Sequence, residues 1–258
     1  MSKRNTQQRR HTIITELNQR GEVSVDQLAM RFDTSEVTIR KDLSALEKSG
    51  LLLRRYGGAV PLPQEIIESK PENLSKRKIL IAKQAAKLIR DHNRIIIDSG
   101  RTTSALVAEL EQKQGLVVMT NSLAIANDIQ ALENEPTLLM TGGTWDARSE
   151  AFQGLVAEQV LRSYDFDQLF IGADGIDIAR GTTTFNELIG LSQVMAEVAR
   201  EVIVMVESDK IGRKIPNLEL PWQQIDTLVT DDNLAVSVRN QLEKQGVSLI
   251  CAEITKKG

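Results

Sequence analysis

From about residue 95 onward, short apolar runs alternate with stretches of helical periodicity, and this alternation constrains the fold more than any other feature of the sequence. The predicted strands are 95–97, 116–119, 138–140, 169–171, 202–206, 227–229 and 247–250. The predicted helices are 103–112, 122–132, 154–163, 187–199 and 233–245. Apolar strands separated by helices are typical of a mostly parallel α/β sheet that is covered on both faces.

The first 60 residues have a different pattern, with three helical segments followed by a hairpin. Periodicity predicts helices over 6–20 and 26–32, and a third helix that is capped by Ser35 or Thr34. Its buried stripe is Ile39, Leu43 and Leu46, spaced i, i+4 and i+7. Two short strands are predicted within 51–60, around a glycine turn. This order predicts a winged helix-turn-helix domain at residues 1–60.

A segment between the two patterns, residues 61–75, contains three prolines and little periodicity, and it is predicted to be a linker. A helix follows at 76–90, and its predicted apolar face is formed by Ile79, Ala82, Ala85, Ala86 and Ile89. The α/β domain is therefore expected to occupy residues 76–258.

Charge is distributed unevenly along the chain, whose formal net charge is −3. Residues 1–60 hold 11 Lys and Arg against 7 Asp and Glu, a surplus of four positive charges. The remainder holds 21 against 28, an excess of seven negative charges. A basic end on an acidic chain is typical of nucleic-acid binding, although a short window also varies by chance.

The third predicted helix presents polar and basic residues opposite its apolar stripe. The major groove of DNA admits one α-helix, and Arg and Lys can contact guanine edges or phosphates there. An ordinary solvated helix face is the alternative. Arg54 and Arg55, in the neighbouring glycine hairpin, favour DNA binding. The predicted DNA-binding residues are Ser35, Glu36, Thr38, Arg40, Lys41, Arg54, Arg55 and Tyr56.

Polar residues follow several of the predicted strands at the ends where ligands bind in parallel sheets. Glycine permits close backbone approach, and hydroxyls and backbone N–H groups suit a phosphate. Each loop alone is equally typical of a bare turn. Together, five such strand ends predict a pocket for a small phosphorylated, polyhydroxylated ligand. The predicted effector-binding residues are Asp98, Ser99, Gly100, Arg101, Thr102, Thr103, Asn121, Gly142, Gly143, Asp174, Asp177, Glu187 and Lys210.

Several function classes are disfavoured by the composition. The single cysteine excludes an internal disulfide framework, and the sequence has neither a Walker loop nor a Cys/His metal constellation, so no metal or other cofactor is expected. No apolar run reaches the ~18–20 residues that span a bilayer. We therefore expect a cytoplasmic protein without a membrane partner.

Taken together, these motifs resemble the DeoR family of bacterial sugar-metabolism repressors over nearly the whole chain. The N-terminal residues that carry the resemblance are 21–25, 28–29, 32, 35–43 (SEVTIRKDL), 46–47, 50 and 54–59. In the C-terminal half they are Asp98, Gly100, Thr102, Thr103, Asn121, Gly142, Gly143, Gly154, Gly172, 174–177, Glu187 and Lys210.

The C-terminal half also looks like ribose-5-phosphate isomerase. This resemblance implies a fold shared with sugar-phosphate enzymes but used for sensing, without catalysis. It implies that the 98–104 loop and Lys210 hold a phosphate, while Asp174, Asp177 and Glu187 face the sugar hydroxyls.

Two positions depart from the family's usual residues: Arg101 stands where Thr or Ser is common, and Asp146 where a basic residue is common. One interpretation gives Arg101 an added phosphate contact and makes Asp146 the partner of a cationic group, with an amino-sugar phosphate as the ligand. The other makes Asp146 and Arg148 surface residues.

The resulting hypothesis is a repressor of a sugar or amino-sugar operon that binds a double-stranded operator as a homo-oligomer and is released by a sugar phosphate. A sugar-phosphate isomerase or deaminase with an accessory DNA-binding domain is the alternative, in which Asp174, Glu187 and Lys210 supply acid–base chemistry. An activator is a third possibility, because operator placement sets the sign.

Overall fold

The computed structural model describes residues 3–48, 52–61, 74–147, 149–185, 189–213, 215 and 217–253. It divides into two compact units, Met1–Asn73 and Leu74–Gly258. Residues 62–73, most of the predicted linker, lie outside the described residues. None of the helices in the described ranges has the length and apolar character needed to cross a membrane.

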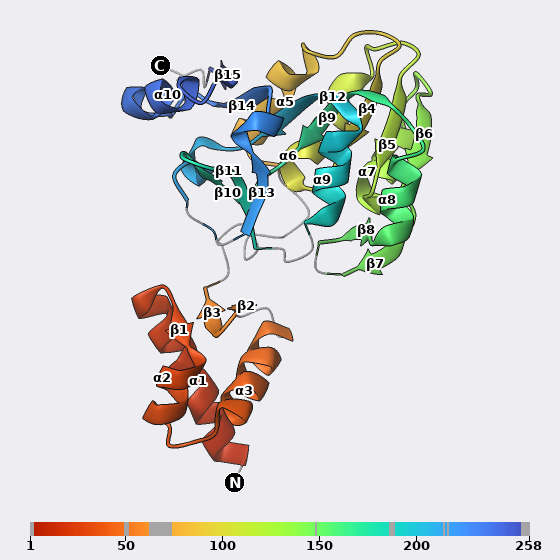
Figure 1. Ribbon diagram of the computed structural model, residues 1–258. Coiled ribbons are helices and arrows are strands. Elements are labelled where there is room, and N and C mark those ends of the chain that lie inside the picture. The colour runs from red at the N-terminus through yellow and green to blue at the C-terminus, as the bar shows by residue number, and fades with distance from the viewer. Residues whose placement is uncertain are drawn as a thin grey trace. The chain divides into compact units, whose positions relative to one another are not determined.

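Within its described residues, the N-terminal unit has three helices and a small antiparallel sheet (Figure 1). Its elements are α1 (Lys3–Arg20), β1 (Val23–Ser24), α2 (Val25–Arg31), α3 (Glu36–Lys48), β2 (Leu53–Arg55) and β3 (Gly58–Val60). The strand order is β1-β3-β2. Gly58 is required here, because a Cβ atom would lie 2.1 Å from the Val23 carbonyl oxygen.

The core of this unit confirms the predicted stripe of α3. Ile39 and Leu43 are fully buried and Leu46 is 6% exposed; they pack with Ile13 and Leu17 of α1. The winged helix-turn-helix order of elements is therefore present as predicted.

The C-terminal unit contains a seven-stranded parallel sheet, with the order β15-β14-β12-β9-β4-β5-β6. Its strands are β4 (Arg94–Ile97), β5 (Val117–Thr120), β6 (Thr137–Met140), β9 (Phe166–Ile171), β12 (Ala199–Met205), β14 (Thr227–Asp231) and β15 (Ser248–Ala252). All seven predicted strands are confirmed within a few residues.

Helices cover both faces of this sheet, as predicted. One face packs against α5 (Lys76–Ala86), α6 (Arg101–Ser104), the 3-10 helix η1 (Val107–Leu110) and α7 (Leu123–Gln130). The other packs against α8 (Leu155–Leu161), α9 (Gly190–Glu197) and α10 (Val236–Glu243). Alternate residues of one strand serve the two faces: Ile95 and Ile97 belong to the first core and Ile96 to the second.

Three details differ from the prediction. Helix α5 ends at Ala86, and Ile79 is 38% exposed while Ile81 is fully buried, because the buried face of the helix runs through Lys78, Ile81 and Ala82. A hairpin, β7 (Thr144–Asp146) with β8 (Ala151–Gln153), was not predicted. Nor was the antiparallel sheet of β10 (Gly175–Asp177), β11 (Gly181–Thr184) and β13 (Asn217–Pro221).

Candidate functional site

The outer face of α3 carries the predicted DNA-binding residues of the helix. Ser35 begins the helix: its Oγ accepts from the Thr38 backbone N–H at 3.3 Å and lies 3.0 Å from the Thr38 hydroxyl. Arg40 pairs with Glu36 at 2.8 Å, and both side chains are more than half exposed. Lys41 is also exposed. An exposed i,i+4 pair is weak, so a DNA phosphate or guanine can replace Glu36 as the partner of Arg40.

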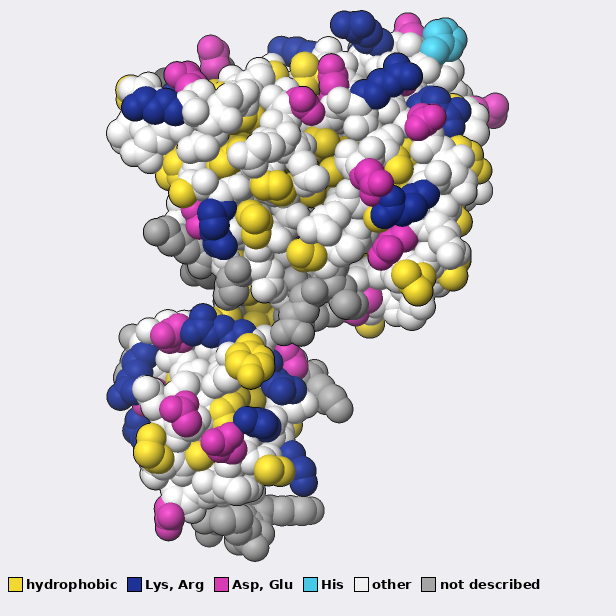
Figure 2. Space-filling model, viewed as in Figure 1, with side chains coloured by type: hydrophobic (Ala, Val, Ile, Leu, Met, Phe, Trp, Pro, Cys, Tyr) yellow, Lys and Arg dark blue, Asp and Glu magenta, His cyan; other side chains and the backbone are white. Residues whose placement is uncertain are grey.

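The hairpin of β2 and β3 carries the other three predicted residues. Its attachment to α3 includes a hydrogen bond of 3.0 Å from the Arg54 backbone N–H to Glu47 Oε1. Arg54 is exposed, Arg55 pairs with Glu22, and Tyr56 is fully exposed in the turn. Figure 2 shows Lys and Arg side chains interspersed with acidic ones on the visible face of this unit.

Two features of helix α3 were not predicted, one on its outer face and one on its inner face. Val37 is 61% exposed on α3, and an apolar side chain there can contact thymine methyl groups. Asp42, on the inner side, is 2% exposed and accepts from Arg9 Nε at 2.6 Å and Arg10 Nε at 2.8 Å. This carboxylate therefore fastens α3 to α1. Its partners lie 32 and 33 residues away, a separation that local periodicity does not reveal.

The carboxyl ends of β4 and β5 bring three predicted effector residues together. Asn121 donates through Nδ2 to Asp98 Oδ1 at 2.8 Å, and its Oδ1 accepts from the Ser99 backbone N–H at 2.9 Å. Desolvation raises the pKa of Asp98 to about 6, with a further contribution from Asp174. Asp174 is thus close enough to Asp98 to repel its charge.

The loop after β4 turns at Gly100, whose φ of +148° disfavours other residues. Thr102 and Thr103 are buried, and the Thr103 hydroxyl donates to the Gly100 carbonyl at 2.9 Å. Arg101 is partly exposed. The threonine side chains therefore shape the turn, while Ser99, Gly100 and Arg101 are its more accessible residues.

Asp174 and Lys210 come together from separate elements. Asp174 accepts from the Thr184 hydroxyl at 2.8 Å and the Phe185 backbone N–H at 3.1 Å. Lys210, in the 3-10 turn η2 (Ser208–Lys210), donates to the Ala173 carbonyl at 3.1 Å. Lys210 therefore lies beside the loop that carries Asp174.

Asp177 is not brought to this place. It lies at the other end of β10, where its carboxylate accepts from Arg180 Nε at 2.8 Å and the Ala179 backbone N–H at 3.0 Å. Three residues of strand separate it from Asp174 by roughly 10 Å. The structure thus gives Asp177 a role in the β10–β11 turn. Glu187 lies outside the described residues.

One carboxyl group of the site was missed by the sequence analysis. Glu219, in β13, is 9% exposed and accepts from the Ser192 hydroxyl at 2.8 Å. Burial first, and then the charges of Asp98 and Asp174, raise its pKa to about 8. Three carboxyl groups, from β13 and the loops after β4 and β9, are therefore within electrostatic reach of one another.

The glycine loop after β6 leads into the β7–β8 hairpin. A Cβ atom at Gly143 would lie 2.6 Å from the Gln153 carbonyl oxygen, so this glycine permits close packing, while Gly142 is partly exposed. Asp146 Oδ2 accepts from Ser149 N at 3.2 Å, Ser149 Oγ at 2.7 Å and Gln153 Nε2 at 3.4 Å. These bonds favour a turn role for Asp146 over contact with a cationic ligand; Arg148 lies outside the described residues.

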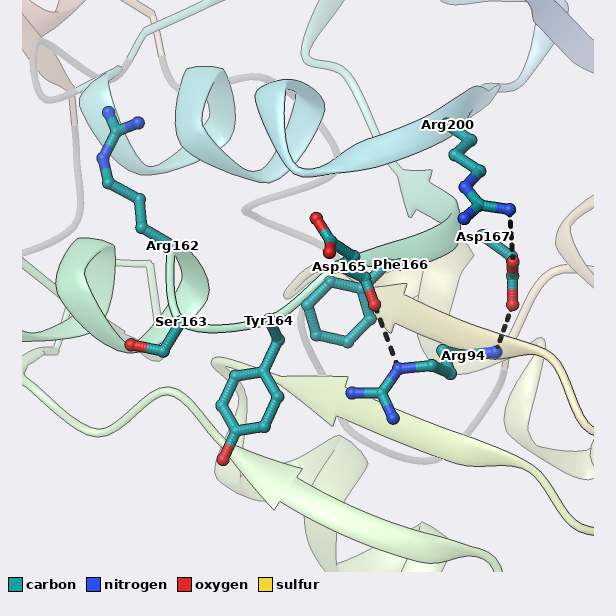
Figure 3. Close-up of a pocket in the computed structure, with 8 residues that line it drawn as sticks. All are labelled: Arg94, Arg162, Ser163, Tyr164, Asp165, Phe166, Asp167 and Arg200. Atoms are coloured by element: carbon teal, nitrogen blue, oxygen red, sulfur yellow. Dashed lines mark hydrogen bonds and ion pairs between the residues drawn. The ribbon is translucent and has the colours of Figure 1, made fainter.

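A hollow of about 360 Å³ lies at the amino ends of the parallel strands, where β4 and β9 begin (Figure 3). Arg94 donates through Nε to the Asp165 carbonyl at 3.0 Å and through its backbone N–H to Asp167 at 2.8 Å. Arg200 approaches Asp167 at 3.8 Å. Arg162, which also lines the hollow, pairs with Glu197. The hollow contains none of the predicted residues.

Two protein-family models together match most of the chain. The family model described as "DeoR-like helix-turn-helix domain" matches residues 9–65, and the one described as "DeoR C terminal sensor domain" matches residues 73–232. A putative aga operon transcriptional repressor from Escherichia coli O157:H7 is 38% identical over 252 residues, which cover 95% of this chain and 93% of that protein.

Two further proteins extend the comparison. The lactose phosphotransferase system repressor of Lactococcus lactis subsp. lactis is 33% identical over 243 residues, covering 90% of this chain and 93% of that one. Among solved structures, ribose 5-phosphate isomerase A from Methanocaldococcus jannaschii has a TM-score of 0.37 at 20% identity, over 52% of this chain and 53% of that one.

Proposed function

Because the chain belongs to the DeoR family of transcriptional regulators, we propose that it represses a sugar or amino-sugar metabolism operon and leaves its operator when a phosphorylated sugar binds the C-terminal unit. The observation that carries the proposal is the pairing of two surfaces in one chain. One is the exposed basic face of α3; the other is the convergence of Asp98, Asn121, Asp174 and Lys210 at the carboxyl edge of a parallel sheet.

In the effector site, the residues divide by chemistry. Ser99, Gly100, Arg101 and Lys210 supply donors and positive charge for the phosphate. The carboxyl groups of Asp98, Asp174 and Glu219 accept hydrogen bonds from sugar hydroxyls, or from the ammonium of an amino sugar. Two copies of the chain, related by a two-fold axis, each place their DNA-binding residues on one half-site, because helix-turn-helix proteins read paired half-sites.

Operator binding is expected to fall when the correct sugar phosphate is added. A gel-shift titration at fixed salt, with glucose, galactose, glucosamine and galactosamine 6-phosphates, measures this release. The coupling expected for such a switch is ~1–3 kcal/mol, or about 5–150-fold in affinity. Titration calorimetry separates the sugar classes: equal affinities for hexose and hexosamine phosphates would remove the amino-sugar preference. Operator binding that ignores every compound would defeat the effector claim but not DNA binding.

Arg40→Ala and Lys41→Ala are each expected to weaken operator binding by ~1–3 kcal/mol, because a base or phosphate contact of that size is lost from α3. Fluorescence anisotropy with a labelled operator measures the change. Lys83→Ala is the matched control, since it removes one exposed positive charge from α5 in the other unit. If both α3 variants bind like the parent, this helix does not read the operator.

The alternative hypothesis, that the chain is a sugar-phosphate isomerase or deaminase, can be tested directly. The family and the relatives named above are transcriptional regulators, which favours a regulator over an isomerase or deaminase. Turnover of ribose 5-phosphate or glucosamine 6-phosphate by the purified chain, lost on Asp174→Asn, would restore the enzyme hypothesis.

A further inference from the structure

Two buried carboxylates lie at the carboxyl ends of neighbouring strands, next to the turn that carries Lys210. Glu207, just after β12, is 4% exposed, and Asp231, the last residue of β14, is fully buried. Asp231 holds the turn η2 directly: it accepts from the Ser208 backbone N–H at 3.0 Å and the Ser208 hydroxyl at 2.6 Å. Buried carboxylates need positively charged or hydrogen-bonding partners to offset the loss of water.

Cationic and hydroxyl partners reach this cluster from the start of α5. Glu207 accepts from the Ser75 hydroxyl at 2.7 Å and pairs with Lys78 at 3.3 Å. Arg77 approaches three carboxylates: its Nε lies 3.2 Å from Glu207, and its Nη1 lies 3.5 Å from Asp209 and 3.6 Å from Asp231. One guanidinium therefore joins α5 to both sides of the turn.

Within the C-terminal unit, Arg77 connects the start of α5 with the turn that carries Lys210. On one side, the turn that Arg77 holds also carries Lys210, whose amine donates to the loop before Asp174. On the other side, α5 is the first helix after residues 62–73, through which the C-terminal unit is connected to the DNA-binding unit. A displacement of the turn by a ligand at Lys210 must move Arg77 or break its ion pairs.

We propose that Arg77 is a positioning residue of the effector response, which couples the Lys210 turn to the start of α5. The inference rests on the proposed function, since it assigns the route by which effector binding is felt outside the site. Arginine suits the role because its planar fork can contact several carboxylates at once, whereas lysine presents a single point charge. The bound effector favours one arrangement of the turn, and the ion pairs impose that arrangement on α5.

Hydrogen exchange of the full chain tests the link without any effector. In Arg77→Met, backbone amides of both 76–81 and 208–213 are expected to exchange at least several-fold faster than in the parent. Lys76→Met is the matched control, because it removes a positive charge from an exposed position one residue away. Unchanged exchange in 208–213 would overturn the proposal. Arg77→Lys, which keeps the charge, serves if Arg77→Met does not fold.

Effector titration then tests whether the link is used. With glucosamine 6-phosphate or whichever hexose phosphate releases the parent, Arg77→Lys is expected to bind that compound and the operator within about threefold of the parent, while the release factor falls from ~5–150-fold to below about threefold. A release factor equal to the parent's would contradict the proposal. If no sugar phosphate releases the parent, the proposed function fails, and the exchange result still decides whether Arg77 positions the turn.

Discussion

Asp42→Ala is expected to unfold the DNA-binding unit and abolish operator binding while the C-terminal unit stays folded. The substitution leaves the Arg9 guanidinium, which is 7% exposed, without the carboxylate that lies 2.6 Å away. Removing one partner of a buried ion pair costs ~3–5 kcal/mol. A unit of this size rarely has more than ~3–5 kcal/mol of stability, so the loss is comparable to the whole. Calorimetric unfolding and operator anisotropy measure the two effects.

The control is another carboxylate of the same helix. Glu36→Ala removes an ion pair whose side chains are more than half exposed, and a surface pair of this kind contributes ~0–1 kcal/mol, so the unit should remain folded. The double variant Arg9→Met, Asp42→Leu is expected to recover most of the lost stability, because an apolar pair replaces the buried charges. Asp42→Ala protein that unfolds like the parent would show that the two arginines are adequately solvated without the carboxylate.

The sequence was sufficient for the parallel sheet because its strands are buried on both faces. Runs such as Ile95–Ile97 and Val202–Val206 have no polar positions to obscure them, and burial on both sides is what such runs indicate. The same reasoning failed for β11, whose residues Gly181–Thr184 are all buried although three are threonines. The hydroxyls of Thr182 and Thr184 make hydrogen bonds within the unit, and a run of threonines lacks the apolar pattern that would reveal a buried strand.

Residues of the candidate site were predictable where the end of a parallel strand alone determines the position of the side chain. Asp98 and Asn121 follow adjacent parallel strands, so their contact follows from the sheet. Asp177 and Glu219 depend on an antiparallel sheet that periodicity did not reveal, and the direction of a hairpin decides which of its residues face the site. Contacts between distant residues, such as Arg77 with Glu207, have no local signal at all.

Glu219→Gln is expected to make the C-terminal unit more stable than the parent at high pH. The pKa of Glu219 is raised from 4.5 to about 8, first by burial and then by Asp98 and Asp174. The folded state therefore keeps a proton that the unfolded chain releases between these values. Parent stability is unaffected by this group below pH 4.5, falls as the pH rises to 8, and carries the full penalty above it.

Glutamine imitates the protonated carboxyl group, and its Oε1 can still accept from the Ser192 hydroxyl. Parent and variant should therefore have similar stability near pH 4.5, and the variant should already be the more stable protein at pH 6.5. At pH 9 the folded parent carries an ionised Glu219 beside two other carboxylates. Between pH 6.5 and pH 9, the difference in the free energy of unfolding between variant and parent should therefore grow by about 2 kcal/mol, since one pKa unit corresponds to ~1.4 kcal/mol. Urea unfolding at both pH values measures it. Glu197→Gln, at an exposed position of α9, controls for the loss of a negative charge as such. A difference that is the same at pH 6.5 and pH 9 would mean that Glu219 is already ionised at the lower pH, and that the carboxyl cluster is open to water.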